Sequence, residues 1–172
     1  MNKQKIAIGV VAFIAMLALS GCGPNVGEKI MEKAIESQTG GKVNVNANNG
    51  EMTIKSKEGD ISASGTGSAT LSADFPKDIY IAPDAQIMVS LANGQNKSYS
   101  AVYTTGMTAS EIYAKYQEDL ALKGWAIEPQ TEINTGDAKM IQYKKGTSRL
   151  NLIVGLSQDK SKTHVQLTGA EN

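Results

Sequence analysis

The sequence predicts an α+β fold in which a short helix and a four-stranded antiparallel meander precede a ββαββββ domain with one antiparallel sheet. Two observations support this prediction. Apolar and polar residues alternate over most of the chain, which is typical of strands with one buried face. Residues 108–123 instead show helical spacing behind a capping signal, which indicates one well-defined helix.

Composition narrows the range of functions. The chain has 172 residues, with 17 Lys and Arg against 17 Asp and Glu, one His and one Cys. Balanced charge argues against a nucleic-acid partner, because such proteins need a basic excess to bind phosphates. A single Cys excludes an internal disulfide framework and a Cys-rich metal site, and a single His excludes a multi-histidine one. We therefore expect no metal and no cofactor.

The N-terminus has the layout of an export signal. Lys3 and Lys5 precede an uncharged, mostly apolar stretch over residues 6–19. This stretch is too short to cross a bilayer as a helix, which takes about 20 residues. A basic region followed by a short apolar region is instead typical of a signal peptide.

The apolar stretch ends in Leu19-Ser20-Gly21-Cys22, which resembles the lipobox of bacterial lipoproteins. The resemblance implies a signal peptide over 1–21, recognised by its peptidase through Leu19, Ser20 and Gly21 and cleaved before Cys22. The Cys22 thiolate is a strong nucleophile that would accept a diacylglyceryl group. The alternatives are an uncleaved anchor helix and a plain secretory signal with a chance Cys.

The same resemblance implies a lipid-anchored protein of the cell envelope. Residues 22–27 would form the lipidated tether, and the lipid on Cys22 would be the contact with the membrane. Gly23 stands where the inner-membrane retention signal of enteric bacteria has Asp. We therefore expect a periplasmic or extracytoplasmic location, at the outer membrane rather than the inner one if the host has two.

Residues 28–74 are predicted to form a helix and a β-meander. Over 28–37 the apolar residues fall on one side of a helix, which either covers the following sheet or lies on lipid. Four short strands are expected between residues 42 and 73, with Asn49-Gly50 as the strongest hairpin signal. Their apolar positions are Val43, Val45, Ala47, Met52, Ile54, Ile61, Ala63, Ala69, Leu71 and Ala73.

A linker is predicted over 75–84, between Phe75-Pro76 and Pro83-Asp84. Asp74, Asp78 and Asp84 lie in or beside it. Their spacing does not match a calcium loop, which needs ligands at tight alternate positions and a closing Glu. We therefore predict no metal site in this linker.

Residues 85–172 are predicted to form the second domain. Ile87, Val89 and Leu91 alternate on its first strand, and a second strand returns after the Asn93-Gly94 turn. Thr108 and Glu111 would form a capping box at the start of the helix, which ends at Gly124. The apolar stripe of the helix is Ala109, Ile112, Tyr113, Tyr116 and Leu120. Further strands are expected over 126–132, 137–145, 148–156 and 162–168.

This half resembles domains of bacterial envelope lipoproteins. The resemblance rests on the Phe75-Pro76 entry and on the pattern Tyr113-x-x-Tyr116-x-x-x-Leu120-x-x-x-Gly124-Trp125. The order of elements is similar to that of the helix-grip domains of BamC-like envelope lipoproteins. The resemblance implies a helix-grip-like α+β domain with a non-enzymatic accessory role.

The sequence contains no motif that commits it to catalysis. It has no G-x-S-x-G, no Walker A sequence, no H-E-x-x-H and no C-x-x-C. His164 falls on the polar side of a predicted strand, as an exposed surface residue would. The aromatic residues of the second half either fill its core or line a ligand groove between helix and sheet; they are Tyr99, Tyr103, Tyr113, Tyr116 and Trp125.

The sequence therefore predicts a membrane-anchored extracytoplasmic lipoprotein that is not an enzyme. It would act as an interaction or envelope accessory protein, with another envelope protein as partner. The alternative is a binding module for a small hydrophobic or envelope-derived ligand.

Overall fold

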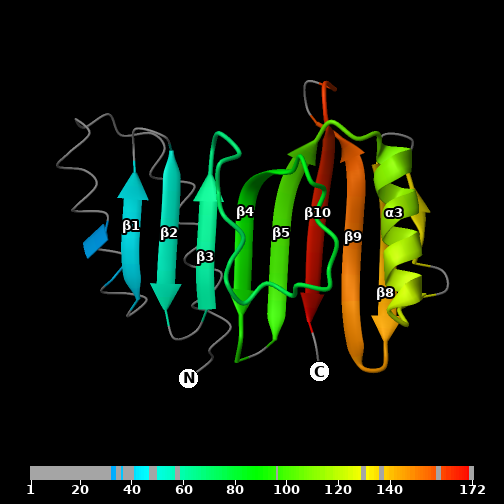
Figure 1. Cartoon of the computed structure of the whole chain (residues 1–172), viewed down its shortest axis with the longest axis horizontal. Helices are drawn as coiled ribbons and strands as arrows, with labels where there is room; N and C mark the ends of the chain where they lie inside the picture. The colour runs from blue at the N-terminus through cyan, green and yellow to red at the C-terminus, as the bar shows by residue number, and fades with distance from the viewer. Residues whose placement is uncertain are drawn as a thin grey trace.

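The computed structural model describes residues 32, 33, 36, 41–46, 50–56, 59–95, 97–128, 131–135, 138–157 and 160–170. Within these residues ten strands form one sheet, and helix α3 packs on one face of it (Figure 1). The elements are β1 (Lys42–Asn46), β2 (Glu51–Ser56), β3 (Gly59–Ser64), β4 (Gln86–Asn93), β5 (Ser98–Thr105), α3 (Ala109–Leu122), β6 (Ala126–Ile127), β7 (Ile133–Asn134), β8 (Ala138–Lys145), β9 (Ser148–Leu156) and β10 (Thr163–Ala170).

The sheet joins both predicted parts of the chain. Its order is β1-β2-β3-β4-β5-β10-β9-β8-β6, with β7 also paired to β8. β3 pairs with β4, so that Ile61 lies opposite Leu91. The predicted α+β class, with a separate four-stranded meander and a helix-grip-like domain, is therefore wrong. The physical reason is that a few short strands cannot bury one face alone, and they gain stability by extending a neighbouring sheet.

The fourth predicted strand of the meander does not form. Residues 68–73 make one isolated bridge, between Ser68 and Ile87, and otherwise cross the face of the sheet. The Thr70 amide donates to Ser62 Oγ at 3.2 Å, and the Ser72 amide donates to Ser90 Oγ at 2.9 Å. Because serine hydroxyls satisfy these amides, the segment needs no neighbouring strand.

Residues 69–85, here called the covering segment, lie over the same face as α3 (Figure 1). Ala69, Phe75, Ile79 and Ala82 are buried in the main core. The face that α3 and the covering segment protect is called the helix face. The segment predicted as a linker thus contributes part of the core.

Helix α3 begins where the sequence predicts. The Thr108 side chain accepts a hydrogen bond from the Glu111 amide at 3.2 Å, and Glu111 Oε2 accepts one from the Thr108 amide at 2.8 Å. This reciprocal pair confirms the capping box.

The helix also ends as expected. The Trp125 amide donates to the Leu120 carbonyl at 2.9 Å, and the Gly124 amide donates to the Ala121 carbonyl at 3.0 Å. These two bonds form a Schellman motif, which requires a left-handed residue. Gly124 supplies it with φ +81°.

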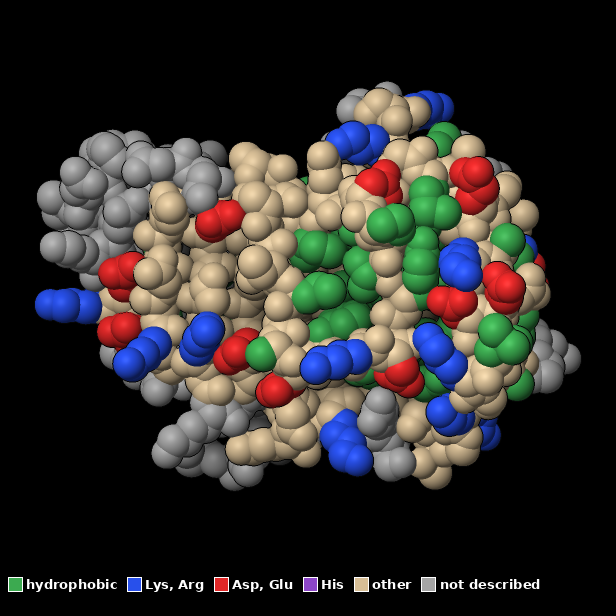
Figure 2. All heavy atoms as spheres, viewed as in Figure 1, with side chains coloured by type: hydrophobic (Ala, Val, Ile, Leu, Met, Phe, Trp, Pro, Cys, Tyr) green, Lys and Arg blue, Asp and Glu red, His purple; other side chains and the backbone are tan. Residues whose placement is uncertain are grey.

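The main core lies between the sheet and its cover. Ile112, Tyr116 and Leu120 of α3 are at most 1% exposed. They pack with side chains of the central strands, which include Tyr103, Ile141, Tyr143, Leu150, Leu152, Val165 and Leu167. Figure 2 shows hydrophobic side chains gathered on this side of the molecule over β4, β5, β10 and α3, whereas the surface over β1–β3 is mostly polar.

The apolar side chains of β1–β3 lie on the side of the sheet that faces away from α3. Val43 and Ile54 are buried there in a second, smaller cluster. Residues that pair directly point to the same face of a sheet. The pairing of Ile54 with Ile61, and of Ile61 with Leu91, places this cluster away from α3. This side is called the opposite face.

A β-bulge in β4 explains part of this change in which face of the sheet carries the apolar side chains. The register shifts between Ile87 and Val89. Ile87 therefore points to the helix face, whereas Val89 and Leu91 point to the opposite face. The prediction that all three alternate on one side is wrong for Ile87, because the extra residue of a bulge reverses the alternation.

The outer edge of β1 is bonded to two glutamates. Glu36 Oε1 accepts from the Val43 amide at 3.2 Å, and Glu32 Oε1 accepts from the Val45 amide at 3.0 Å. Glu32 and Glu36 are helical, one turn apart, and so match the spacing of alternate amides along a strand. The other residues of the predicted 28–37 helix, except Lys33, lie outside the described residues.

Candidate functional site

The predicted lipidation site lies outside the described residues. Leu19, Ser20, Gly21 and Cys22 all belong to this part of the chain, so their roles stay predictions. Within the part that the structure describes, no helix combines the length and the apolar character needed to cross a membrane.

The aromatic residues predicted for the core or for a groove mostly fill the core. Tyr99, Tyr103 and Tyr116 are at most 2% exposed, and Trp125 is 6% exposed. Tyr113 alone among the five is partly exposed. The hydroxyls of Tyr103 and Tyr116 are hydrogen-bonded at 3.1 Å. Burial raises the pKa of Tyr103 to about 12 and the pKa of Tyr116 well above its usual value, so both stay neutral.

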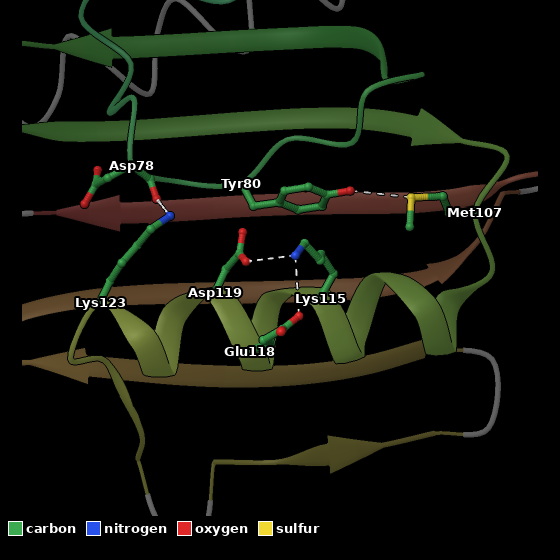
Figure 3. Close-up of polar contacts among 7 residues, drawn as sticks. All are labelled: Asp78, Tyr80, Met107, Lys115, Glu118, Asp119 and Lys123. Atoms are coloured by element: carbon green, nitrogen blue, oxygen red, sulfur yellow. Dashed lines mark hydrogen bonds and ion pairs between the residues drawn. The ribbon is translucent and has the colours of Figure 1, made fainter.

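Polar contacts fasten the covering segment to α3 (Figure 3). The Tyr116 hydroxyl donates to the Tyr80 carbonyl at 2.5 Å, and the Lys123 ammonium donates to the Asp78 carbonyl. The Tyr80 hydroxyl bonds Met107 Sδ at 3.5 Å. These groups are engaged with each other, so the junction holds the segment in place.

Lys115 of α3 pairs with two acidic residues of the same helix. Lys115 bonds Asp119 at 3.1 Å and Glu118 at 3.4 Å, while Glu111 is held in the capping box (Figure 3). The bond from Asp119 is the main cause that raises the pKa of Lys115. These exposed pairs contribute little to stability.

The three linker aspartates do not converge. Asp84 accepts from the Thr105 hydroxyl and, at 2.8 Å, from the Gly106 amide, and these bonds lower the pKa of Asp84. Asp74 and Asp78 line an open hollow of about 340 Å³. Its other lining residues are Pro76, Asn93, Gly94, Lys97, Ser98 and Tyr99. Among the described residues, no three His, Cys, Asp or Glu side chains are grouped closely enough to hold a metal.

The opposite face carries a continuous line of apolar side chains. Nine directly paired residues, one per strand, cross the sheet from β1 to β7, and eight of them are apolar. This cross-strand row consists of Val45, Met52, Ala63, Val89, Val102, Gln166, Ile153, Met140 and Ile133. Val89 and Met140 are each 37% exposed and Ile133 is 50% exposed, so the row contacts solvent.

The surroundings of the cross-strand row are nearly uncharged. On one side the next line of paired residues is Leu91, Ser100, Thr168, Asn151 and Gln142. Among the described strand residues of the opposite face, the charged side chains are Lys144 and Arg149, which lie directly opposite each other on β8 and β9. The Arg149 guanidinium forms an ion pair with the Glu128 carboxylate, with 3.5 Å between Nη1 and Oε2.

His164 also lies on the opposite face, between the fully buried Val165 and the turn before β10, and it is partly exposed. Its partner on β5 is Thr104 and its partner on β9 is Gly155. No carboxylate or thiol accompanies His164 in these pairings, so they supply no catalytic group beside it.

Sequence reasoning missed the cross-strand row. A signal for it exists in Ala101-Val102 and in Leu152-Ile153-Val154, where consecutive residues of a strand are apolar. Such runs are typical of strands with apolar surroundings on both faces. The alignment of these positions across nine strands depends on the register, which the sequence does not display.

Comparisons with known proteins add no family. No family model, no curated protein and no solved structure matches the chain.

Proposed function

We propose that this protein is a membrane-anchored extracytoplasmic lipoprotein that acts without catalysis, through contact between the opposite face of its sheet and an envelope protein. The observation that supports the contact is the cross-strand row. Each Å² of apolar surface removed from water contributes about 25 cal/mol, so covering a partly exposed row is favourable. A lipid on Cys22 would keep this surface close to its partner in the envelope.

The alternative of a small hydrophobic ligand has less support. A groove between α3 and the sheet would need the aromatic rings of the second half as its lining. Tyr103, Tyr116 and Trp125 are buried in packing contacts instead. The hollow beside Asp74 and Asp78 has these two carboxylates and Lys97 in its wall, and charged groups there suit an apolar ligand poorly.

Site-specific photocrosslinking in intact cells tests this function. A photoreactive residue replaces Met140 on the opposite face, and the matched control replaces the exposed Ala114 on α3. We expect crosslinked species from position 140 and none from position 114. Equal crosslinking from both positions, or none from position 140, would contradict a contact through this face.

A further inference from the structure

We infer that residues 28–37, which join the predicted anchor to the sheet, cover Val43 and Ile54 on the opposite face as a helix. This segment is called the N-terminal helix. It packs on the sheet and does not lie on lipid. The inference deepens the proposed function and rests on it in one respect, because it limits the surface open to an envelope protein to the strands from β4 onwards.

Val43 and Ile54 are buried more deeply than their position in the sheet explains. Val89, on the same face, has a strand on either side and is still 37% exposed. Val43 lies on the edge strand β1, with one neighbouring strand, yet it is 8% exposed, and Ile54 is 2% exposed. Side chains of the same sheet cover each other only from the side. A further layer therefore lies on Val43 and Ile54 and does not reach Val89.

The described strands do not supply this layer. Within the described part of the chain, the apolar side chains that pack against Val43 and Ile54 all belong to β1–β3 themselves. They are Val45, Met52 and Ile61. Helix α3 and the covering segment are on the helix face and cannot reach the cluster. The layer therefore comes from elsewhere in the chain.

Two hydrogen bonds hold part of the N-terminal helix beside this cluster. The Glu36 carboxylate accepts from the Val43 amide at 3.2 Å, and the Glu32 carboxylate accepts from the Val45 amide at 3.0 Å. The two glutamates are helical and one turn apart, so the helix runs along β1 in the opposite direction. Among the segments outside β1–β3, this is the one that the structure places next to Val43.

Lys33 indicates which side of the N-terminal helix faces the sheet. Successive residues of a helix lie about 100° apart around its axis. Met31 and Ile35, which directly precede the two glutamates, therefore belong to one flank of them, and Lys33, which follows the first, belongs to the other. Lys33 is exposed, so its flank faces water. The apolar flank is the one available to cover the buried cluster.

This arrangement couples the predicted anchor to one end of the sheet. Residue 28 follows Cys22 by six positions, a span of roughly 20 Å when fully extended. A helix packed on β1 and β2 would therefore hold this end of the sheet near the bilayer. The apolar surface left for an envelope protein lies further along the sheet, where Val89, Met140 and Ile133 are 37–50% exposed.

Thiol labelling of the full-length Cys22→Ser chain tests this packing. Ile35→Cys and its matched control Lys33→Cys each supply a single thiol, two positions apart on the same helix. We expect the thiol at position 35 to react with a maleimide roughly tenfold more slowly, because it is reached only when the helix leaves the sheet. In concentrated urea the two rates should be equal. Circular dichroism verifies that both chains are folded.

Hydrogen exchange at the Val43 and Val45 amides gives a measurement without thiols. Ile35→Asn buries a polar amide in the contact, so it should detach the helix and speed exchange at both positions by roughly tenfold. Lys33→Asn puts the same side chain on the flank that faces water and should leave the exchange unchanged. This pair keeps the test informative if a cysteine variant does not fold.

Three results would overturn the inference. One is equal labelling at positions 33 and 35. Another is exchange that Ile35→Asn and Lys33→Asn change to the same extent. The third is labelling at position 35 that slows only when vesicles of phosphatidylethanolamine and phosphatidylglycerol are added, which would place the helix on lipid. Photocrosslinks from position 140 together with a freely reactive position 35 would leave the proposed function standing, whereas a protected position 35 without such crosslinks would contradict only that function.

Discussion

The ring of Tyr99 on β5 lies against the backbone of Gly169, the residue directly opposite it on β10. A Cβ at position 169 would lie 2.3 Å from Tyr99 Cζ, closer than any real contact. Phe75 of the covering segment meets the same tyrosine edge to face, with ring centroids 5.5 Å apart. The absence of a side chain at Gly169 therefore allows both rings to be buried.

Gly169→Ala is expected to lower the free energy of unfolding by about 1–3 kcal/mol, the usual cost of overpacking a core. Urea denaturation measures it. The matched control is Gly65→Ala, where an added Cβ meets nothing within 4 Å. The double variant Gly169→Ala/Tyr99→Leu should lose less stability than the sum of the losses measured for the two single variants. Equal effects at positions 65 and 169 would contradict this packing.

Thr108→Ala removes the side-chain half of the capping box and should cost about 1 kcal/mol in the free energy of unfolding. The reason is that the Glu111 amide loses its acceptor. Thermal melting measures the change. Ser110→Ala, two positions on and exposed, is the control and should be neutral or slightly stabilising. A melting temperature unchanged by Thr108→Ala would count against the cap.

Tyr116→Phe should lower the free energy of unfolding by about 1–3 kcal/mol, because it leaves the Tyr80 carbonyl without its donor and removes the bond to Tyr103. Tyr143→Phe is the control. Within the described residues the buried Tyr143 hydroxyl has no hydrogen-bond partner, so its removal should cost little. Similar losses in both variants, by chemical denaturation, would be inconsistent with the bonds described.

Stability should fall at alkaline pH. Burial raises the pKa of Tyr103 from 10.0 to about 12, so the folded chain holds this proton after the unfolded chain has lost it. The contribution is complete below pH 10 and disappears as pH rises through about 12, at no more than about 1.4 kcal/mol per pH unit. Urea denaturation at a series of pH values between 10 and 12 measures how steeply the free energy of unfolding falls with pH. This fall should be shallower in Tyr103→Phe, and an identical fall would exclude Tyr103 as a cause of the pH dependence.

Cys22→Ser should abolish lipid labelling and release the protein from the membrane fraction, because the acceptor of the predicted lipid is lost. Labelling with a radioactive fatty acid, followed by fractionation, measures both effects. Asn25→Ser, in the predicted tether, is the control and should keep the label. Membrane association that survives Cys22→Ser would contradict anchoring through the lipid.

Local signals in the sequence predict the local structure well. Thr108 with Glu111 and the glycine at 124 act on backbone groups within one turn, and both ends of α3 are found where they indicate. The strands predicted over 137–145 and 148–156 also form, as β8 and β9. In these elements the contacts that decide the structure lie close together in the chain.

Long-range contacts account for the errors. The amides of residues 70 and 72 bond to Ser62 and Ser90, and the second of these lies 18 residues away. No periodicity in the segment itself reveals such partners. The pairing of β3 with β4 and the bulge at Ile87 likewise depend on strands that meet only after folding. For the same reason the alignment of the cross-strand row could not be read from any single strand.

The two glutamate contacts at β1 limit how these molecules can assemble. An unpaired strand edge is a template on which further chains add, and its growth leads to fibres. Here the outward amides of Val43 and Val45 already have carboxylate acceptors, which an incoming strand would have to displace. Addition of further strands along the β1 edge is therefore disfavoured, because each incoming strand would first have to break these two bonds.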